Sequence, residues 1–487
     1  MPRPWRAPFS LLVSVFLFPL ASFAANSFEN TAVVRTVDLG GTLTYVTTTY
    51  AIRALEDGSS VYTIALGEQE HARTSWLEAK LKGQTKRLPL EDFGFHSESG
   101  VYLYTIELPK ALDTNGTANL VIDTVQSHAT YAWPQEARQQ EEQAMKYHSE
   151  VLVISPYKTV VQRTKLRLPT PQVHSYSTPE GIAFAKESVV TKSGATITYG
   201  PFHDIPPSAT SGFQEKSQKP YTVHYAFEYP VLDITKLERS AEISHWGSNL
   251  NIQDNIVFYN AGPRLKGHFS RLEFQTQAYF GRPKAHTIPS VTLHLPPGIR
   301  DAYFYDLVGN VSTSRLRTAP SVPKGSEGGR NSVLELKPRY PIMGGWNYSF
   351  TLGWDSPLED YAGYDSATGK YVVSVPIMTV IVGSVVDEAE VKIVLPEGAT
   401  DIEYHLPYPA LSENMSTHIS YLDTIGRPMI TLKYAQLTDK HGGNIYIAYK
   451  VPFTAHLRKP VAVATAFLGV FALGLISKRV DTRIRQK

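Results

Sequence analysis

Residues 221–229 read YTVHYAFEY, and their side chains alternate residue by residue between two sets. One face of a strand would carry Val223, Tyr225, Phe227 and Tyr229, and the other Thr222, His224 and Glu228, because successive strand residues point to opposite sides. Similar runs occur at 42–55 and 371–386, and the chain holds 28 Tyr. Tyr, Thr and Val favour strands. Many short strands separated by turns predict a mainly β fold built of β-sandwiches.

The composition limits the class of protein. The chain has 487 residues, 42% of them hydrophobic, with a net charge of +2 and no Cys. This length is enough for two or three domains of roughly 100–200 residues. Without a long basic run we expect no nucleic-acid partner. The lack of Cys excludes disulfides and Cys-based zinc sites.

One short motif occurs twice. Residues 295–301 read LPPGIRD and residues 395–401 read LPEGATD, each after an alternating apolar run. The repetition predicts two similarly built strand–turn–strand units. Chance recurrence of a common turn is the alternative.

The N-terminus is typical of a secretory signal. Arg3 and Arg6 precede the apolar stretch 9–20, and the small residues Ser22 and Ala24 follow it. This order of charge, apolar run and small residues predicts a signal peptide over 1–24. An uncleaved membrane helix is the alternative.

The C-terminus contains an uncharged run, VAVATAFLGVFALGLI, at 461–476. As a helix it would be about 24 Å long, close to the thickness of a membrane's hydrocarbon core. A soluble core helix would show a polar face, and this run has none. More positive charges follow the run than precede it, which predicts a cytosolic C-terminus. The chain is therefore expected to be a single-pass type I membrane protein.

These observations divide the chain into five predicted parts: signal peptide 1–24, lumenal β-rich domain 25–235, lumenal β-rich domain 236–457, transmembrane helix 460–477 and short cytosolic tail 478–487. One surface helix is predicted over 134–148, where Pro opens a Gln- and Glu-rich segment. Four N-x-S/T sequons are candidates for N-glycosylation: Asn115, Asn310, Asn347 and Asn414.

The search for catalytic motifs finds no HExxH zinc motif and no GxSxG nucleophile elbow. The segment 262–267 has the glycine spacing of a phosphate-binding loop, but His268 stands where Lys is required. We expect no catalytic residue, no cofactor and no metal site.

Several segments together carry a resemblance, in this order along the chain: 199–206 (YGPFHDIP), 243–247 (ISHWG), 265–271 (LKGHFSR), 309–314 (GNVSTS), 338–346 (PRYPIMGGW), 395–399 (LPEGA) and 421–428 (YLDTIGRP). They resemble the ribophorin I family, non-catalytic subunits of the oligosaccharyltransferase of the endoplasmic reticulum. The resemblance implies a scaffold in the complex that moves a preassembled glycan from dolichol diphosphate to Asn of N-x-S/T. It implies a catalytic, multi-spanning partner subunit, further subunits, and a role in positioning nascent polypeptide.

Two other classes remain open at this point. A stand-alone membrane lectin or chaperone of the endoplasmic reticulum would suit the abundant Tyr. A glycosidase would need two carboxylates about 5–10 Å apart across a cleft. The resemblance also leaves one difference: some family members have a helical cytosolic domain after the membrane span, whereas only a short tail is expected here.

Overall fold

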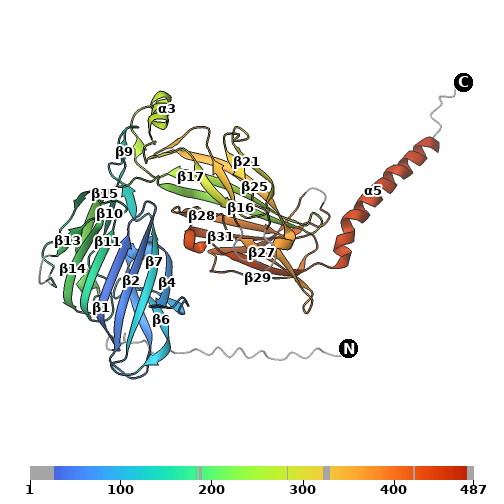
Figure 1. Cartoon of the computed structure of the whole chain (residues 1–487). Coiled ribbons are helices and arrows are strands. Elements are labelled where there is room, and N and C mark those ends of the chain that lie inside the picture. The colour runs from blue at the N-terminus through green and yellow to red at the C-terminus, as the bar shows by residue number, and fades with distance from the viewer. Residues whose placement is uncertain are drawn as a thin grey trace, which may run out of the picture.

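The computed structural model describes residues 27–182, 184–185, 189–281, 283–321, 330–420 and 423–479. It shows two β-rich bodies and a long helix that projects from the second (Figure 1). The mainly β fold and the C-terminal apolar helix agree with the prediction. The predicted signal peptide 1–24 and nearly all of the predicted tail lie outside the described residues.

The first domain is built on a seven-stranded sheet. Its strands are, in spatial order, β13 (Val190–Ser193), β14 (Thr196–Ile205), β11 (Thr159–Arg167), β1 (Phe28–Asp38), β2 (Leu43–Ala54), β7 (Thr117–Ser127) and β4 (Thr74–Leu81). Two smaller sheets pack on it: β3 (Ser59–Gly67), β6 (Val101–Leu112) and β5 (Leu90–His96), and then β12 (Val173–Tyr176), β15 (Pro220–Ala226), β10 (Ala144–Glu150) and β8 (Thr130–Ala132). Each smaller sheet shares a buried apolar cluster with the large one.

The second domain has the same layers. Its seven-stranded sheet runs β21 (Arg300–Asp306), β25 (Asn347–Pro357), β17 (Asn249–Asn260), β16 (Leu232–Ser244), β28 (Val386–Val394), β31 (Arg427–Leu437) and β30 (Ser412–His418). The smaller sheets are β20 (Val291–Leu295), β23 (Ser332–Leu336) and β22 (Arg315–Arg317), and β26 (Ala362–Asp365), β27 (Lys370–Pro376), β32 (Asn444–Lys450) and β29 (Thr400–His405). One continuous core joins all three.

The two domains repeat one topology. In each, the first strand pairs antiparallel with the next strand and parallel with a later one: β1 with β2 and β11, and β16 with β17 and β28. The remaining strands correspond one to one, so that β13 matches β30 and β4 matches β21. The sandwich architecture is therefore used twice, and the two copies can be compared position by position.

The repeated LPPG and LPEG motifs form two turns of similar geometry. Gly298 and Gly398 both have positive φ, of 72° and 80°, and so do Asp301 and Asp401. A bulge follows at the same distance in each unit. Each turn carries the chain from one layer of the sandwich to the other, which confirms the two similarly built units.

The predicted helix over 134–148 is wrong. The segment instead holds β9 (Glu136–Ala137), which pairs with β18 (Arg264–Leu265), and the start of β10. Two of its glutamines, Gln139 and Gln143, are buried. Gln143 donates to the carbonyl oxygens of Phe227 and Tyr229 at 3.2 and 2.8 Å. Tertiary contacts of buried amides outweigh the helix propensity of Gln and Glu here.

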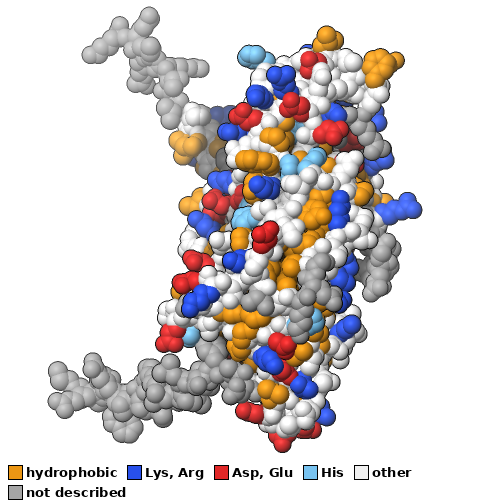
Figure 2. Space-filling model, turned by 90° about the vertical axis from the view of Figure 1, so that its left-hand side faces the viewer, with side chains coloured by type: hydrophobic (Ala, Val, Ile, Leu, Met, Phe, Trp, Pro, Cys, Tyr) orange, Lys and Arg blue, Asp and Glu red, His pale blue; other side chains and the backbone are white. Residues whose placement is uncertain are grey.

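The remaining short elements are α1 (Glu68–Arg73), α2 (Ser211–Ser217), α3 (Arg271–Phe280), β19 (Thr287–Ile288), β24 (Ile342–Met343), α4 (Leu358–Tyr361) and the 3-10 helix η1 (Asp439–His441). Figure 2 shows one side of the molecule, on which basic and acidic side chains are interspersed. No field of a single sign dominates that face.

The two domains meet where the turn between β1 and β2 approaches the starts of β16 and β28. Leu43 and Val125 share a buried cluster with Val385. Beside it, Thr42 Oγ1 donates to Asp233 Oδ1 at 2.5 Å, and His128 Nε2 lies 2.7 Å from Asp387 Oδ1. The predicted domain boundary between 235 and 236 falls within β16, all of which pairs in the second sheet; the boundary stays a prediction.

Candidate functional site at the base of the membrane helix

The long helix α5 (Phe453–Arg479) contains the predicted span 460–477. It is long and apolar enough to cross a membrane, and none of its most apolar stretch is buried in the protein. Lys478 and Arg479 lie in its last turn. An unburied apolar helix of this length is a candidate membrane span.

The first turn of α5 packs on the LPEG turn of the second domain. Ala455 is buried, and a Cβ added to Gly398 would come within 2.7 Å of the Ala455 Cβ. Gly398 therefore serves two purposes, because it provides the positive φ of the turn and lets the helix approach closely.

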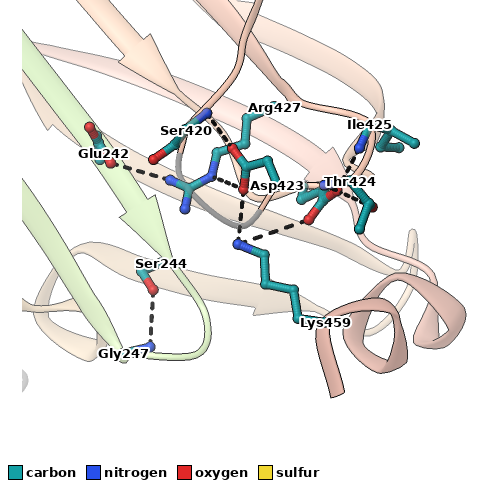
Figure 3. Close-up of polar contacts among 10 residues, drawn as sticks. Glu242, Ser244, Gly247, Ser420, Asp423, Thr424, Ile425, Arg427 and Lys459 are labelled. Carbon is teal, nitrogen blue, oxygen red and sulfur yellow. Dashed lines mark hydrogen bonds and ion pairs between the residues drawn. The ribbon is translucent and has the colours of Figure 1, made fainter. Parts of the chain in front are cut away.

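A polar cluster fixes the helix from the other side (Figure 3). Lys459, on α5, reaches Asp423 Oδ1 at 2.9 Å and Glu397 Oε2 at 3.9 Å. Arg427, at the start of β31, approaches the same Asp423 oxygen at 3.3 Å and Glu242 Oε2 of β16 at 3.2 Å. Two cations thus converge on the buried Asp423 carboxylate.

The backbone of the turn before β31 holds both carboxylates in place. Glu397 Oε1 accepts from Thr424 N at 2.7 Å and from Ile425 N at 2.9 Å, and Asp423 Oδ2 accepts from Ser420 N at 2.8 Å. Burial alone would raise the pKa of each carboxyl. The hydrogen bonds outweigh burial, aided at Asp423 by Arg427 and Lys459, so both pKa values lie below their ordinary range. Both carboxyl groups are therefore ionised at neutral pH.

A cavity of about 780 Å³ reaches the base of α5. Its lining includes His245, Arg300, Asp301, Tyr364 and, from α5, His456. Burial and the nearby His456 lower the pKa of His245 to about 4, so its imidazole is neutral. The described residues contain no group of three or more His, Cys, Asp or Glu side chains that could hold a metal ion. The arrangement positions a helix on the second domain.

The sequons stay predictions, but their positions are clear. The described structure leaves all four side chains exposed: Asn115, Asn310, Asn347 and Asn414. Asn115 lies in the turn before β7 and has positive φ, and Asn414 lies on the edge strand β30.

The sequence alone did not reveal the ionic cluster as a site. Its parts were visible: Lys459 stands directly before the uncharged run, and LPEG contains Glu397. They come together because the chain leaving β32 returns to the LPEG turn. No local sequence pattern shows this return.

The comparisons with known proteins agree on one family. The family model described as Ribophorin I matches residues 28–478. The chain is 28% identical to dolichyl-diphosphooligosaccharide–protein glycosyltransferase subunit 1B of Arabidopsis thaliana, over 98% of each chain. It is 28% identical to subunit 1 of Caenorhabditis elegans, over 95% of this chain and 74% of that one.

Among solved structures, the M1 zinc metallopeptidase of Deinococcus radiodurans aligns over 44% of this chain and 42% of its own, with 10% identity and a TM-score of 0.25. A score this low does not establish a shared fold. The match of the family model over residues 28–478 leads to one conclusion: the chain belongs to the ribophorin I family.

Proposed function

We propose that this chain is a non-catalytic scaffold subunit of an oligosaccharyltransferase in the membrane of the endoplasmic reticulum. The complex would transfer a preassembled glycan from dolichol diphosphate to Asn of N-x-S/T in nascent proteins. The observation that supports this most is the match of the family model, together with the names of the relatives, which are subunits of such a transferase.

The geometry at the base of α5 supports the scaffold part of the proposal. Ala455 is seated on the LPEG turn and Lys459 is paired with Asp423, so the helix and the second domain are joined by packing and by charge. A joint of this kind holds a lumenal sandwich at a set position relative to the membrane. We further propose single-pass type I topology, with both domains lumenal and catalysis in a separate multi-spanning subunit.

The test is a pull-down in mild detergent through a C-terminal tag, assayed for transfer of a lipid-linked oligosaccharide to an N-x-T peptide. We expect transferase activity and a multi-spanning subunit to co-purify with the tagged chain, and we expect the isolated chain to be inert. Recovery of the chain alone, under conditions that keep the cell's transferase intact, would overturn the proposal in favour of a lectin or chaperone.

A further inference from the structure

The edge strand β30 of the second domain carries an unusual row of exposed apolar side chains. Leu411, Met415 and Ile419 occur at every fourth residue, so they lie on one face of the strand and its flanks. They are 74%, 53% and 75% exposed. Among the described residues nothing pairs with the outer edge of β30, which is the last strand of its sheet.

The exposed row belongs to the core face of the sheet. Met415 lies opposite Ile430 on β31, and Glu413 lies opposite Leu432, in an antiparallel pair that places opposite residues on the same side. Ile430 and Leu432 are fully buried members of the second core. The covering layer stops short of the row: its last strand β29 reaches β30 through one bond, from Tyr404 Oη to Glu413 Oε2 at 2.7 Å.

The first domain shows how the equivalent edge is closed. Its matching strand β13 is only four residues long and includes Lys192. Phe184 packs beside it on the core, and its ring lies 5.8 Å from that of Phe213 on α2. The first domain therefore covers with its own chain the position that the second domain leaves open.

Of the devices that protect edges, β30 has one, the charge of Glu413 on its core face, and Tyr404 binds that carboxylate. Edge strands commonly carry Lys, Pro or a bulge, because an unpaired edge otherwise adds another strand. In the two large sheets, β4 and β21 have bulges and β13 is short. β30 has seven residues and a regular register with β31, and residues 411–419 contain no Lys, Arg or Pro.

We propose that β30 is an assembly edge, to which a partner subunit of the complex adds a strand with apolar side chains at alternate positions. This inference rests on the proposed function. A permanently covered edge needs no protection, whereas an edge that bound substrate chains transiently would be bare between encounters. The permanent occupant is therefore a subunit.

The position of β30 fits a membrane-bound partner. The turn that follows it packs against the end of the row, since a Cβ on Gly426 would meet Thr417 at 2.6 Å and Ile419 at 3.2 Å. The same turn contains Asp423, which binds Lys459 of α5. The row thus leads to the base of the membrane helix. Asn414 lies opposite Thr431 on the other face, so a glycan there would leave the row open.

The first measurement is hydrogen–deuterium exchange on the wild-type chain, alone and in the purified complex. We expect the amides of β30 to exchange about tenfold or more slowly in the complex, because pairing protects edge amides. Equal exchange in both samples, with the complex intact, overturns the inference and leaves the proposed function standing. Protection that appears only when acceptor peptide is added also overturns it, in favour of substrate binding.

The second measurement identifies the occupant. Since the chain has no Cys, Met415→Cys and Ser412→Cys each give one attachment point for a photo-crosslinker. Ser412 is exposed and lies on the opposite face of the same strand. We expect position 415, and not 412, to crosslink to an extended, alternating segment of one co-purifying subunit. A crosslink to a second copy of this chain would overturn the inference.

A pair of substitutions tests how much the apolar row contributes to binding of the partner. Met415→Lys should lower recovery of the partner on the order of tenfold, because an unpaired ammonium would be buried at the interface. Ser412→Lys should leave recovery unchanged. Equal recovery with both variants contradicts the inference. If a variant fails to fold, the hydrogen–deuterium exchange of the wild-type chain still tests the inference.

Discussion

The two domains are copies of one sandwich, and they differ in the junction that each makes with the part of the chain that follows it. The first domain meets the second through the β1–β2 turn and the end of β7. The second domain meets α5 near the corresponding β16–β17 turn, where His245 and Trp246 lie beside Ala455 and Lys459. Equivalent ends of one fold thus make two junctions of different chemistry.

The junction between the domains combines apolar packing with a titratable pair. Val385 is buried between Leu43 and Val125, and Trp76 packs edge-on against His441 at 4.8 Å. The junction with α5 is instead a network of full charges around Asp423. We expect the first arrangement to respond to pH near neutrality and the second not to, and the following experiments test this difference.

The largest effect is expected at the helix junction. Asp423→Ala would leave Lys459 and Arg427 without their shared carboxylate in a partly buried site, at a cost of about 3 kcal/mol in the free energy of unfolding. Urea unfolding of the detergent-solubilised full chain, followed by Trp fluorescence, measures this. Asp360→Ala, on the short helix α4, should change stability by less than about 0.5 kcal/mol. Equal effects of the two variants would show that the network does not hold the junction.

The next effect concerns the bridge between the domains formed by β9 and β18. Gly344 lies against the chain entering β18: an added Cβ would be 1.9 Å from Pro263 O. Gly344→Ala should therefore displace β18 and cost about 2 kcal/mol by overpacking. The matched control is Gly363→Ala, since a Cβ there meets no atom within 4 Å. Unfolding in urea should separate the two variants, and identical curves would contradict the assigned contact.

The sequence predicted the strands and the helix that depend on a local pattern of residues. Alternation in segments such as 221–229 predicted the strands, since Tyr221, Val223 and Tyr225 are all buried, and the uncharged run predicted α5. The repeat of one topology escaped notice because the matching strands share layer and order rather than residues. The buried Gln143 was misread as a surface residue, because only its distant carbonyl partners, Phe227 and Tyr229, make burial of the amide favourable.

The candidate sites depend on contacts between distant segments, so their residues could not be recognised from the sequence. Each residue of the ionic cluster is ordinary in its own segment, and Lys459 gains its role from contacts with distant residues, among them Asp423, 36 positions away. The apolar row on β30 was not predicted either, because the spacing of Leu411, Met415 and Ile419 does not show that their side chains are exposed.

A smaller effect is expected at His128, which faces Asp387 at 2.7 Å and the buried Asp233 at 3.7 Å. His128→Ala removes a charged hydrogen bond that is partly open to solvent and should weaken the domain contact by about 1 kcal/mol at pH 6. Dyes on two introduced cysteines, one in each domain of this Cys-free chain, report the opening by energy transfer. His294→Ala, on the exposed side of β20, should have no effect. Unchanged energy transfer in His128→Ala would show that this residue does not stabilise the domain contact.

The smallest effect is a difference in pH response. The hydrogen bond to Asp387 is the main cause that raises the pKa of His128, so its stabilisation is complete below about 6.5 and is lost as pH rises through the higher folded value. Burial raises the pKa of Asp233 to about 6, so folding favours its protonated form, and ionisation between pH 4 and 6 also weakens the contact. The domain contact should therefore loosen between pH 6 and pH 8.

The helix junction should not change over that range. The pKa values of Asp423 and Glu397 lie below their ordinary ones, so their stabilisation is present above about pH 4 and is lost only as pH falls further through the folded values. Energy transfer between the domains should fall from pH 6 to pH 8, while a second dye pair, spanning the second domain and the base of α5, stays constant. If both pairs move together, the two junctions are coupled and the contrast between them fails.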